Sequence, residues 1–179
     1  MSSSASDTIT LGGGCFWCLE AVFVRLRGVL AVESGYCNGH LPNPNYEQVC
    51  SGHSGHAEVV QVRFDPSVVS LSQLLQVFFA IHDPTTLNRQ GNDVGTQYRS
   101  GIYTHSAEQA EVARAVLAEA QSAWGGQVVT ELLPLAAYTP AEPYHQRYFE
   151  NHPDAGYCAF VVAPKVAKFQ QAFRSLLRD

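Results

Sequence analysis

Three observations in the sequence predict an α+β fold, arranged as a two-layer sandwich around a mixed sheet. Segments with the two-residue period of strands alternate along the chain with segments of helical period. Gly, Pro, Asn and Asp residues separate these segments at short intervals. The length of 179 residues is that of one domain able to bury a core. We expect residues 1–179 to form a single domain, with residues 1–7 as a flexible N-terminal tail.

The composition excludes several classes of partner. The chain carries a net charge of −5 and has no basic run, so nothing suggests nucleic acid or an anionic membrane surface. No apolar stretch approaches the length of a membrane span, and residues 1–7 lack the basic and apolar regions of a secretory signal. We therefore expect a cytoplasmic protein that binds neither nucleic acid nor membranes.

The first half of the chain alternates short apolar segments with glycine-rich turns. A three-glycine run, Gly12 to Gly14, separates the first strand from the first helix, and Gly28 ends that helix. The expected elements are strands over 8–11, 28–36 and 57–64, a helix over 20–26 and a helical turn over 46–50.

The second half contains two capping boxes, Ser-x-x-Gln, which begin at Ser70 and Ser106. The first opens a helix that ends near Ile81, and the second opens a helix that Gly125 and Gly126 stop. The remaining expected elements are strands over 101–104 and 127–133, a short helix over 142–151 and a final helix from Pro164.

Residues 82–100 lie between these helices and show no periodicity. A polar loop this long is usually functional, and it supplies Asp93, Tyr98 and Arg99. The first six elements run strand, helix, strand, strand, helix, strand, which matches the split βαβ order of a ferredoxin-like core. We expect the active cleft near the N-terminus of the first helix.

Cys15 is the strongest candidate for a reactive residue, because it follows three glycines where a strand turns into a helix. Unpaired backbone N–H groups and the helix dipole at such a position favour the thiolate, which is the nucleophilic form. Phe16 and Trp17 follow directly and predict an apolar pocket beside it. A cysteine that only fills the core would not need the three glycines.

The other cysteines offer a second thiol. Cys18 shares a helical face with Cys15, so it either forms a disulfide with it or packs beneath the site. Cys158 follows a turn-like stretch, where it could be carried to Cys15 or remain a free surface thiol. An odd total of five argues against a disulfide framework. Zinc usually needs four ligands from two close pairs, and Cys37 and Cys50 stand alone, so we expect no metal.

Glu58 lies on the apolar face of the strand over 57–64, with Val60 and Val62. Burial there would raise its pKa and keep it protonated, as a general acid requires. If the strand begins one residue later, Glu58 is an exposed edge residue, and the residues alone favour that alternative. His145 could act as a base, but nothing in the sequence brings it to Cys15, so we expect a solvated or core histidine. The residues alone therefore indicate a cysteine redox enzyme or a cysteine hydrolase.

Several longer motifs resemble the A-type peptide methionine sulfoxide reductases, and they keep the family's order from about Ile9 to Cys158. The family is known for an α/β two-layer fold, in agreement with the element order. The matching segments are Gly14-Cys15-Phe16-Trp17, Gly35-Tyr36, the run 42–50, the run 55–59, His82-Asp83-Pro84 and the run 89–99.

The resemblance implies a nucleophile and an acid for sulfoxide reduction. Cys15 would attack the sulfoxide sulfur, and Glu58 would give a proton to the sulfoxide oxygen. A sulfoxide oxygen leaves poorly unless it is protonated, so the reaction needs an acid as well as a thiol. This makes Glu58 the favoured acid.

The resemblance also implies residues that hold the substrate. Phe16 and Trp17 would form the wall against its S-methyl group. Tyr46 and Tyr98 would donate hydrogen bonds to its oxygen, and Asp93 would hold the polar network of the site. Exclusion of water would strengthen these hydrogen bonds.

The resemblance further implies that Cys15 becomes a sulfenic acid, which a second cysteine converts to a disulfide that thioredoxin reduces. Cys158 matches the family's resolving position after Gly-Tyr. Many members have Gly where this chain has Cys18, so Cys18 is the alternative resolving thiol. We expect a monomer without bound cofactor that acts on the S epimer, in oxidised proteins and in free methionine sulfoxide, with thioredoxin or dithiothreitol as reductant.

Two alternative functions stay open. One is a thioredoxin-like dithiol oxidoreductase that uses Cys15 and Cys18, although an aromatic pair lies between them and the strand order differs. The other is a non-enzymatic module that grips methionine-like side chains through Phe16 and Trp17. It leaves the glycine–cysteine geometry unexplained.

Overall fold

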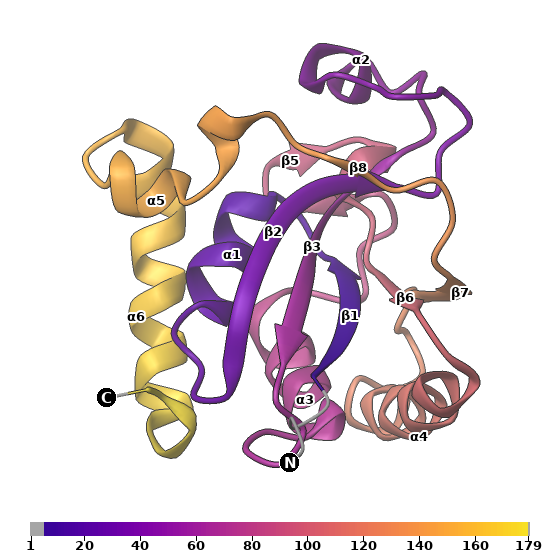
Figure 1. Ribbon diagram of the computed structural model, residues 1–179, viewed down its shortest axis with the longest axis vertical. Helices are drawn as coiled ribbons and strands as arrows, with labels where there is room; N and C mark the ends of the chain where they lie inside the picture. The colour runs from indigo at the N-terminus through magenta and orange to yellow at the C-terminus, as the bar shows by residue number, and fades with distance from the viewer. Residues whose placement is uncertain (1–5, 179) are drawn as a thin grey trace.

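A computed structural model describes residues 6–178 and contains a mixed sheet of six strands (Figure 1). Neighbouring strands pair antiparallel except β6 and β7, which are parallel. The expected α+β fold with a mixed sheet is confirmed. In spatial order the strands are β7 (Glu131–Pro134), β6 (Gly101–Thr104), β1 (Asp7–Gly12), β3 (Ala57–Phe64), β2 (Val29–Cys37) and β8 (Thr139–Pro140).

The four central strands have the ferredoxin-like order β6-β1-β3-β2. β1 and β2 both run antiparallel to β3 between them, as the split βαβ unit requires. Asp7, which we expected in the tail, is the first residue of β1. Of the rest of that expected tail, Ser6 lies in no helix or strand, and residues 1–5 lie outside the described residues. Within the described chain, no helix combines the length and the apolar character needed to cross a membrane.

One face of the sheet carries the main core. Figure 1 shows α1 and α3 on the same side of the strands, and α6 packs against both of these helices. Val60 and Val62 of β3 belong to the same buried cluster as Phe23 and Phe78 from the helices. The longer helices are α1 (Phe16–Phe23), α3 (Leu71–Ile81), α4 (Ala107–Ala123) and α6 (Ala163–Ala172).

Several boundaries differ from the predicted ones. The helix expected over 20–26 begins at Phe16. The strand expected over 127–133 begins only at Glu131, because the N–H of Val128 bonds to Gln121 and that of Val129 bonds to Pro84. The short remaining elements are α2 (Tyr46–Cys50), the hairpin strands β4 (Arg89–Gln90) and β5 (Asp93–Val94), and α5 (Tyr148–Asn151).

Candidate active site

The glycine-rich turn between β1 and α1 is packed closely from behind. A Cβ at Gly13 would lie 3.0 Å from the His82 ring, and a Cβ at Gly14 would lie 2.7 Å from Gln90. Gly14 also has a φ of 89°, which L side chains rarely adopt. Glycines therefore let the chain pass over His82 and Gln90 and deliver Cys15 to the N-cap of α1.

Cys15 is 9% exposed and sits where the sequence predicted. Burial raises the pKa of the Cys15 thiol well above its usual range, and the nearby Glu58 and Cys18 raise it further. A hydrogen bond from the Trp17 backbone lowers the pKa, but by less. The backbone groups at the helix N-terminus favour the thiolate, as the sequence indicated, but desolvation outweighs them and favours the thiol.

Glu58 faces the main core and is 1% exposed, so the alternative of an exposed edge residue is wrong. Phe16 donates its backbone N–H to Oε1 at 3.2 Å. Oε2 is buried and has no hydrogen-bond partner among residues 6–178. Burial raises the pKa of Glu58 to about 8, so the carboxyl holds a proton at neutral pH. The site contains a protonated acid with one oxygen held in place and the other free.

Aromatic rings surround this acid and thiol. The Phe16 ring lies 5.7 Å from Tyr36 and stacks with Tyr46 at 6.4 Å between centroids. Trp17 stacks on Tyr148 at 3.8 Å with an interplanar angle of 6°. Phe16 and Trp17, from which the sequence predicted an apolar pocket, thus pack among other aromatic rings.

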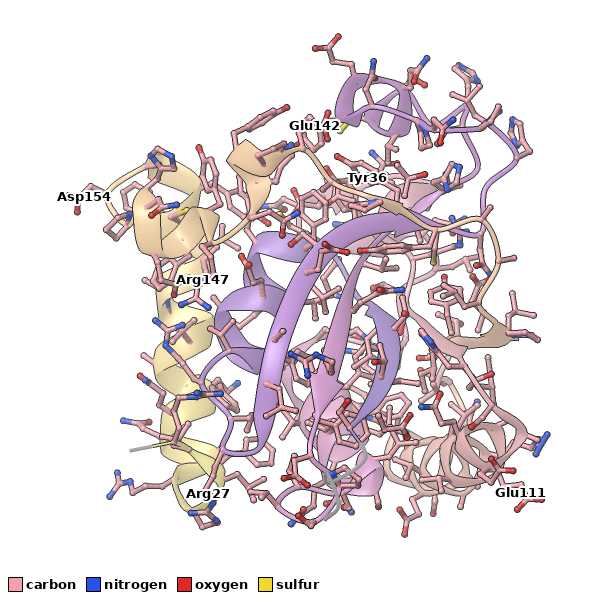
Figure 2. All side chains as sticks on the ribbon, in the orientation of Figure 1. Arg27, Tyr36, Glu111, Glu142, Arg147 and Asp154 are labelled. Carbon is pink, nitrogen blue, oxygen red and sulfur yellow. The ribbon has the colours of Figure 1, made fainter. Side chains whose placement is uncertain are left out.

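Two tyrosines near Glu58 keep their hydroxyl protons. Burial, followed by the charge of Glu58, raises the pKa of both Tyr46 and Tyr98 above the usual range. Glu142 fixes the base of α2, because its carboxylate accepts from the Tyr36 hydroxyl at 2.7 Å and from the Tyr46 N–H at 2.9 Å. Figure 2 shows Tyr36 and Glu142 next to each other at the upper edge of the sheet.

Asp93 joins the site through β5. Its Oδ2 accepts from the Tyr157 hydroxyl at 2.5 Å, and Tyr157 meets the edge of Trp17 at 5.8 Å. The charge of Asp93 also raises the pKa of Glu58 and of Tyr98. The long segment over 82–100 thus brings Asp93 and Tyr98 to the same place, as expected, although a hairpin orders part of it.

Three of the cysteines form a group around α1, and none is in a disulfide. Cys18 is 2% exposed, and its charge raises the pKa of Cys15, as that of Cys158 does for Cys18. Cys158 is completely buried and begins a π-helical turn that leads into α6. The expected turn at Cys158 is therefore wrong, because the C-terminal helix starts earlier than Pro164 suggests.

Sequence reasoning left several residues out of the site, among them His145, which it expected as a solvated or core histidine and which lies in the core. His145 is 1% exposed, and its Nδ1 accepts from the Trp17 indole N–H at 3.1 Å. Its Nε2 is buried with no partner in the described chain. Tyr148, Tyr157 and Glu142 were missed with it. The cluster of aromatic residues over 144–149 could have indicated a role in the site. Nothing in the sequence showed that this segment packs against α1.

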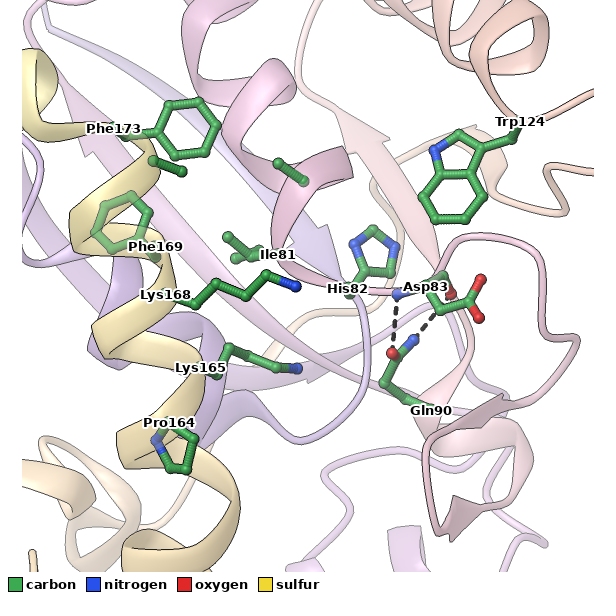
Figure 3. Close-up of a pocket in the computed structure, with 12 residues that line it drawn as sticks. Ile81, His82, Asp83, Gln90, Trp124, Pro164, Lys165, Lys168, Phe169 and Phe173 are labelled. Carbon is green, nitrogen blue, oxygen red and sulfur yellow. Dashed lines mark hydrogen bonds between the residues drawn. The ribbon is translucent and has the colours of Figure 1, made fainter.

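A cavity with a polar rim lies away from these residues (Figure 3). It has a volume of about 450 Å³ and lies between α3 and α6, where Lys165 and Lys168 face Asp83 and Gln90. His82 and Gln90 line this cavity and also support Gly13 and Gly14. The cavity is thus behind the turn, and Cys15 does not line it.

Comparisons with known proteins agree on one family. The sequence model described as peptide methionine sulfoxide reductase matches residues 7–176. The chain is 58% identical to the peptide methionine sulfoxide reductase MsrA of Polynucleobacter asymbioticus, over 96% of this chain and 91% of that protein.

Two solved yeast structures extend the similarity to three dimensions. Mxr1 of Saccharomyces cerevisiae in its reduced form has a TM-score of 0.81 and 36% identity, covering 88% of this chain and 91% of Mxr1. Mxr1 in complex with Trx2 has a TM-score of 0.58 and 28% identity, covering 82% of this chain and 87% of that one.

Proposed function

Because this chain belongs to the peptide methionine sulfoxide reductase family, we propose that it reduces methionine S-sulfoxide, in proteins and free, to methionine. The observation that carries the proposal is the pairing of Cys15 with the buried, protonated Glu58. A sulfoxide oxygen must be protonated as the thiol attacks, and this site holds both groups at the N-terminus of α1.

The first step transfers oxygen from the substrate to Cys15. The Cys15 sulfur attacks the sulfoxide sulfur while Glu58 gives its proton to the sulfoxide oxygen. The Cys15 thiol proton passes to the resulting Glu58 carboxylate, so the acid is restored. The new bond between the two sulfurs and the substrate S–O bond then break as the hydroxyl transfers to the Cys15 sulfur, which leaves methionine and a sulfenic acid. The substrate sulfur gains the electron pair that the Cys15 sulfur loses.

The surrounding rings hold the substrate in this reaction. Phe16 and Trp17 would contact the S-methyl group, for which an apolar wall is the matching surface. Tyr46 and Tyr98 would donate to the sulfoxide oxygen, since their raised pKa values keep both hydroxyls protonated. Asp93 would orient Tyr157 at the edge of the pocket.

A second thiol closes the cycle. The Cys158 thiol would attack the Cys15 sulfenic acid, forming a disulfide and releasing water. Thioredoxin would then reduce that disulfide by exchange. The complex of the yeast relative with Trx2 supports this reductant. Cys158 is buried, so the proposal requires the start of the C-terminal helix to move, and Cys18 is the alternative resolving thiol.

We also propose a cytoplasmic monomer without bound cofactor. Five free cysteines suit a reducing compartment. Turnover of racemic methionine sulfoxide with dithiothreitol tests the function, and we expect loss of the S epimer only, with no turnover in Cys15→Ser. Loss of both epimers, or of neither, would contradict it.

Recycling by thioredoxin tests the second thiol. We expect Cys158→Ser to stall after one turnover and Cys18→Ser to continue. The opposite result would assign resolution to Cys18, and would also suit a dithiol enzyme of the thioredoxin type.

A further inference from the structure

A second buried carboxylate, Glu20, lies on α1 and has no part in the proposed chemistry. It is 1% exposed, and no ion pair to it occurs within residues 6–178. Both of its oxygens accept from the backbone N–H of Arg147, each at 2.8 Å. A carboxyl buried without a cation is costly, and burial raises the pKa of Glu20 to about 7. Packing alone therefore does not explain why a carboxyl group is buried at this position.

Arg147 is held in an uncommon backbone conformation. Its φ of 57° lies in the left-handed region, which is unfavourable for a residue with a side chain. Its own side chain does not cap α5, which begins at the next residue. The two hydrogen bonds to Glu20 hold this backbone from α1, while the side chain of the adjacent Gln146 bonds to the backbone of Ser34 and Ala141.

Two residues close to Arg147 in the chain, one two positions before it and one directly after it, contact Trp17. His145 accepts from the Trp17 indole N–H at 3.1 Å, and Tyr148 stacks on the indole at 3.8 Å. Trp17 and Glu20 are three residues apart on α1, so they share one face of the helix. One face of α1 thus holds the segment over 145–148 in two ways. Glu20 binds the backbone of that segment, and Trp17 contacts its side chains.

We propose that Glu20 is a positioning residue for the substrate pocket: by accepting the Arg147 N–H, it holds His145 and Tyr148 against Trp17 and so fixes the indole in the methyl-binding wall. This inference rests on the proposed function, because that function assigns the wall to the substrate. Glu20 does not touch the reacting atoms, so it should affect substrate binding more than the chemical step.

A neighbouring ion pair provides a matched control. Glu150 of α5 accepts from Arg25 at 2.9 Å and lies 3.7 Å from the Arg147 guanidinium. It ties the same short helix to Arg25, which follows the end of α1, but by its side chain and not through the Arg147 N–H. Glu150→Gln therefore removes a carboxylate from the same contact region and leaves the proposed backbone clamp in place.

Three variants separate the clamp from general loosening. Glu20→Gln keeps an acceptor for the Arg147 N–H, Glu20→Ala removes it, and Glu20→Asp keeps the charge but shortens the side chain. We expect Glu20→Ala and Glu20→Asp to raise KM for methionine sulfoxide about tenfold with kcat nearly unchanged, since pocket geometry is lost but the reacting groups remain. Glu20→Gln and Glu150→Gln should keep KM within about twofold of wild type.

A spectroscopic readout makes the test independent of turnover. The chain has two tryptophans, and Trp124 lies outside the site, so Trp124→Phe leaves Trp17 as the only indole. In that background, Glu20→Ala and Glu20→Asp should shift the Trp17 emission to longer wavelength, and Glu20→Gln should not. Unchanged KM and emission in both variants would overturn the proposal, as would equal losses in Glu20→Gln. If wild type fails to reduce sulfoxide, the proposed function fails, but the emission of Trp17 still decides the clamp.

Discussion

Replacement of Glu58 by Gln tests the environment of the acid through the pH dependence of folding. Burial raises the pKa of Glu58 from 4.5 in a free side chain to about 8 in the folded protein. Between these pH values the folded protein keeps the Glu58 proton and the unfolded chain releases it. The free energy of unfolding therefore falls as the pH rises. This stabilising contribution is complete below pH 4.5 and is lost as the pH rises through about 8.

The size of the effect follows from the width of that window. One proton contributes about 1.4 kcal/mol to the free energy of unfolding for each pH unit. Between pH 4.5 and pH 9, wild type should therefore lose roughly 3–5 kcal/mol more stability than Glu58→Gln. The amide oxygen introduced by Glu58→Gln can still accept the Phe16 N–H, and Glu20, whose pKa is also raised, is present in both proteins.

Urea denaturation at several pH values between 4.5 and 9 measures this difference. Glu111→Gln is the control, because Glu111 is an exposed carboxylate on α4, as Figure 2 shows. The same Glu58→Gln protein should lose about 10²- to 10⁴-fold in kcat, the usual contribution of general acid catalysis. If the stability curves of wild type and Glu58→Gln run parallel, Glu58 is not buried as an acid and the reasoning fails.

Three further results are expected. The descending limb of kcat/KM near pH 8, where Glu58 loses its proton, should disappear in Glu58→Gln, as measured in a pH–rate profile. Gly14→Ala should lower the free energy of unfolding by about 1–3 kcal/mol more than Gly52→Ala. Both glycines have positive φ, but only a Cβ at position 14 would clash with a neighbour, the side chain of Gln90. Equal urea midpoints for the two variants would contradict this. Tyr157→Phe should lower kcat/KM about tenfold by removing the hydrogen bond to Asp93, and unchanged steady-state kinetics would contradict it.

Strand periodicity was the most informative pattern in the sequence. The strands predicted over 57–64 and 101–104 have the observed bounds, and the period of two correctly aligned Glu58 with Val60 and Val62. Alternation works here because the two faces of β3 meet different surroundings, the main core on one side and a small cluster with Tyr103 on the other. The sequence alone did not show whether the strand begins before or after Glu58. In the structure Glu58 pairs with Tyr36 of β2, so it belongs to the strand.

The two capping boxes predicted helix starts correctly, and the turn expected over 46–50 also has the observed bounds. Ser70 and Gln73 form the reciprocal pair, and α3 begins directly after Ser70. Cys15 caps α1 without any side-chain hydrogen bond, so the three glycines marked the turn but no capping box placed the first helical residue. Near the C-terminus, Gly156 suggested a turn, but it does not adopt positive φ and the helical turn at Cys158 follows it.

Long-range contacts account for what remained hidden. His145 lies 128 residues from Trp17 along the chain, and only the fold brings the two side chains together. The same holds for Glu20 and Arg147, whose hydrogen bonds join a helix interior to a backbone N–H that no sequence pattern identifies. Local patterns report on neighbours within a turn or two, so they can find the nucleophile but not the segment that covers it.

The protonation of Cys15 is where local and global effects disagree. A helix N-terminus favours the thiolate, but its influence is confined to the first turn and weakens when the thiol leaves water. Here desolvation is the larger effect, and Glu58 and Asp93 add negative charge nearby. A resting thiolate beside an ionised Glu58 would place two buried charges of the same sign together. A resting thiol beside a protonated carboxyl avoids that cost, so the thiol proton should leave only as the sulfoxide oxygen takes the proton of Glu58.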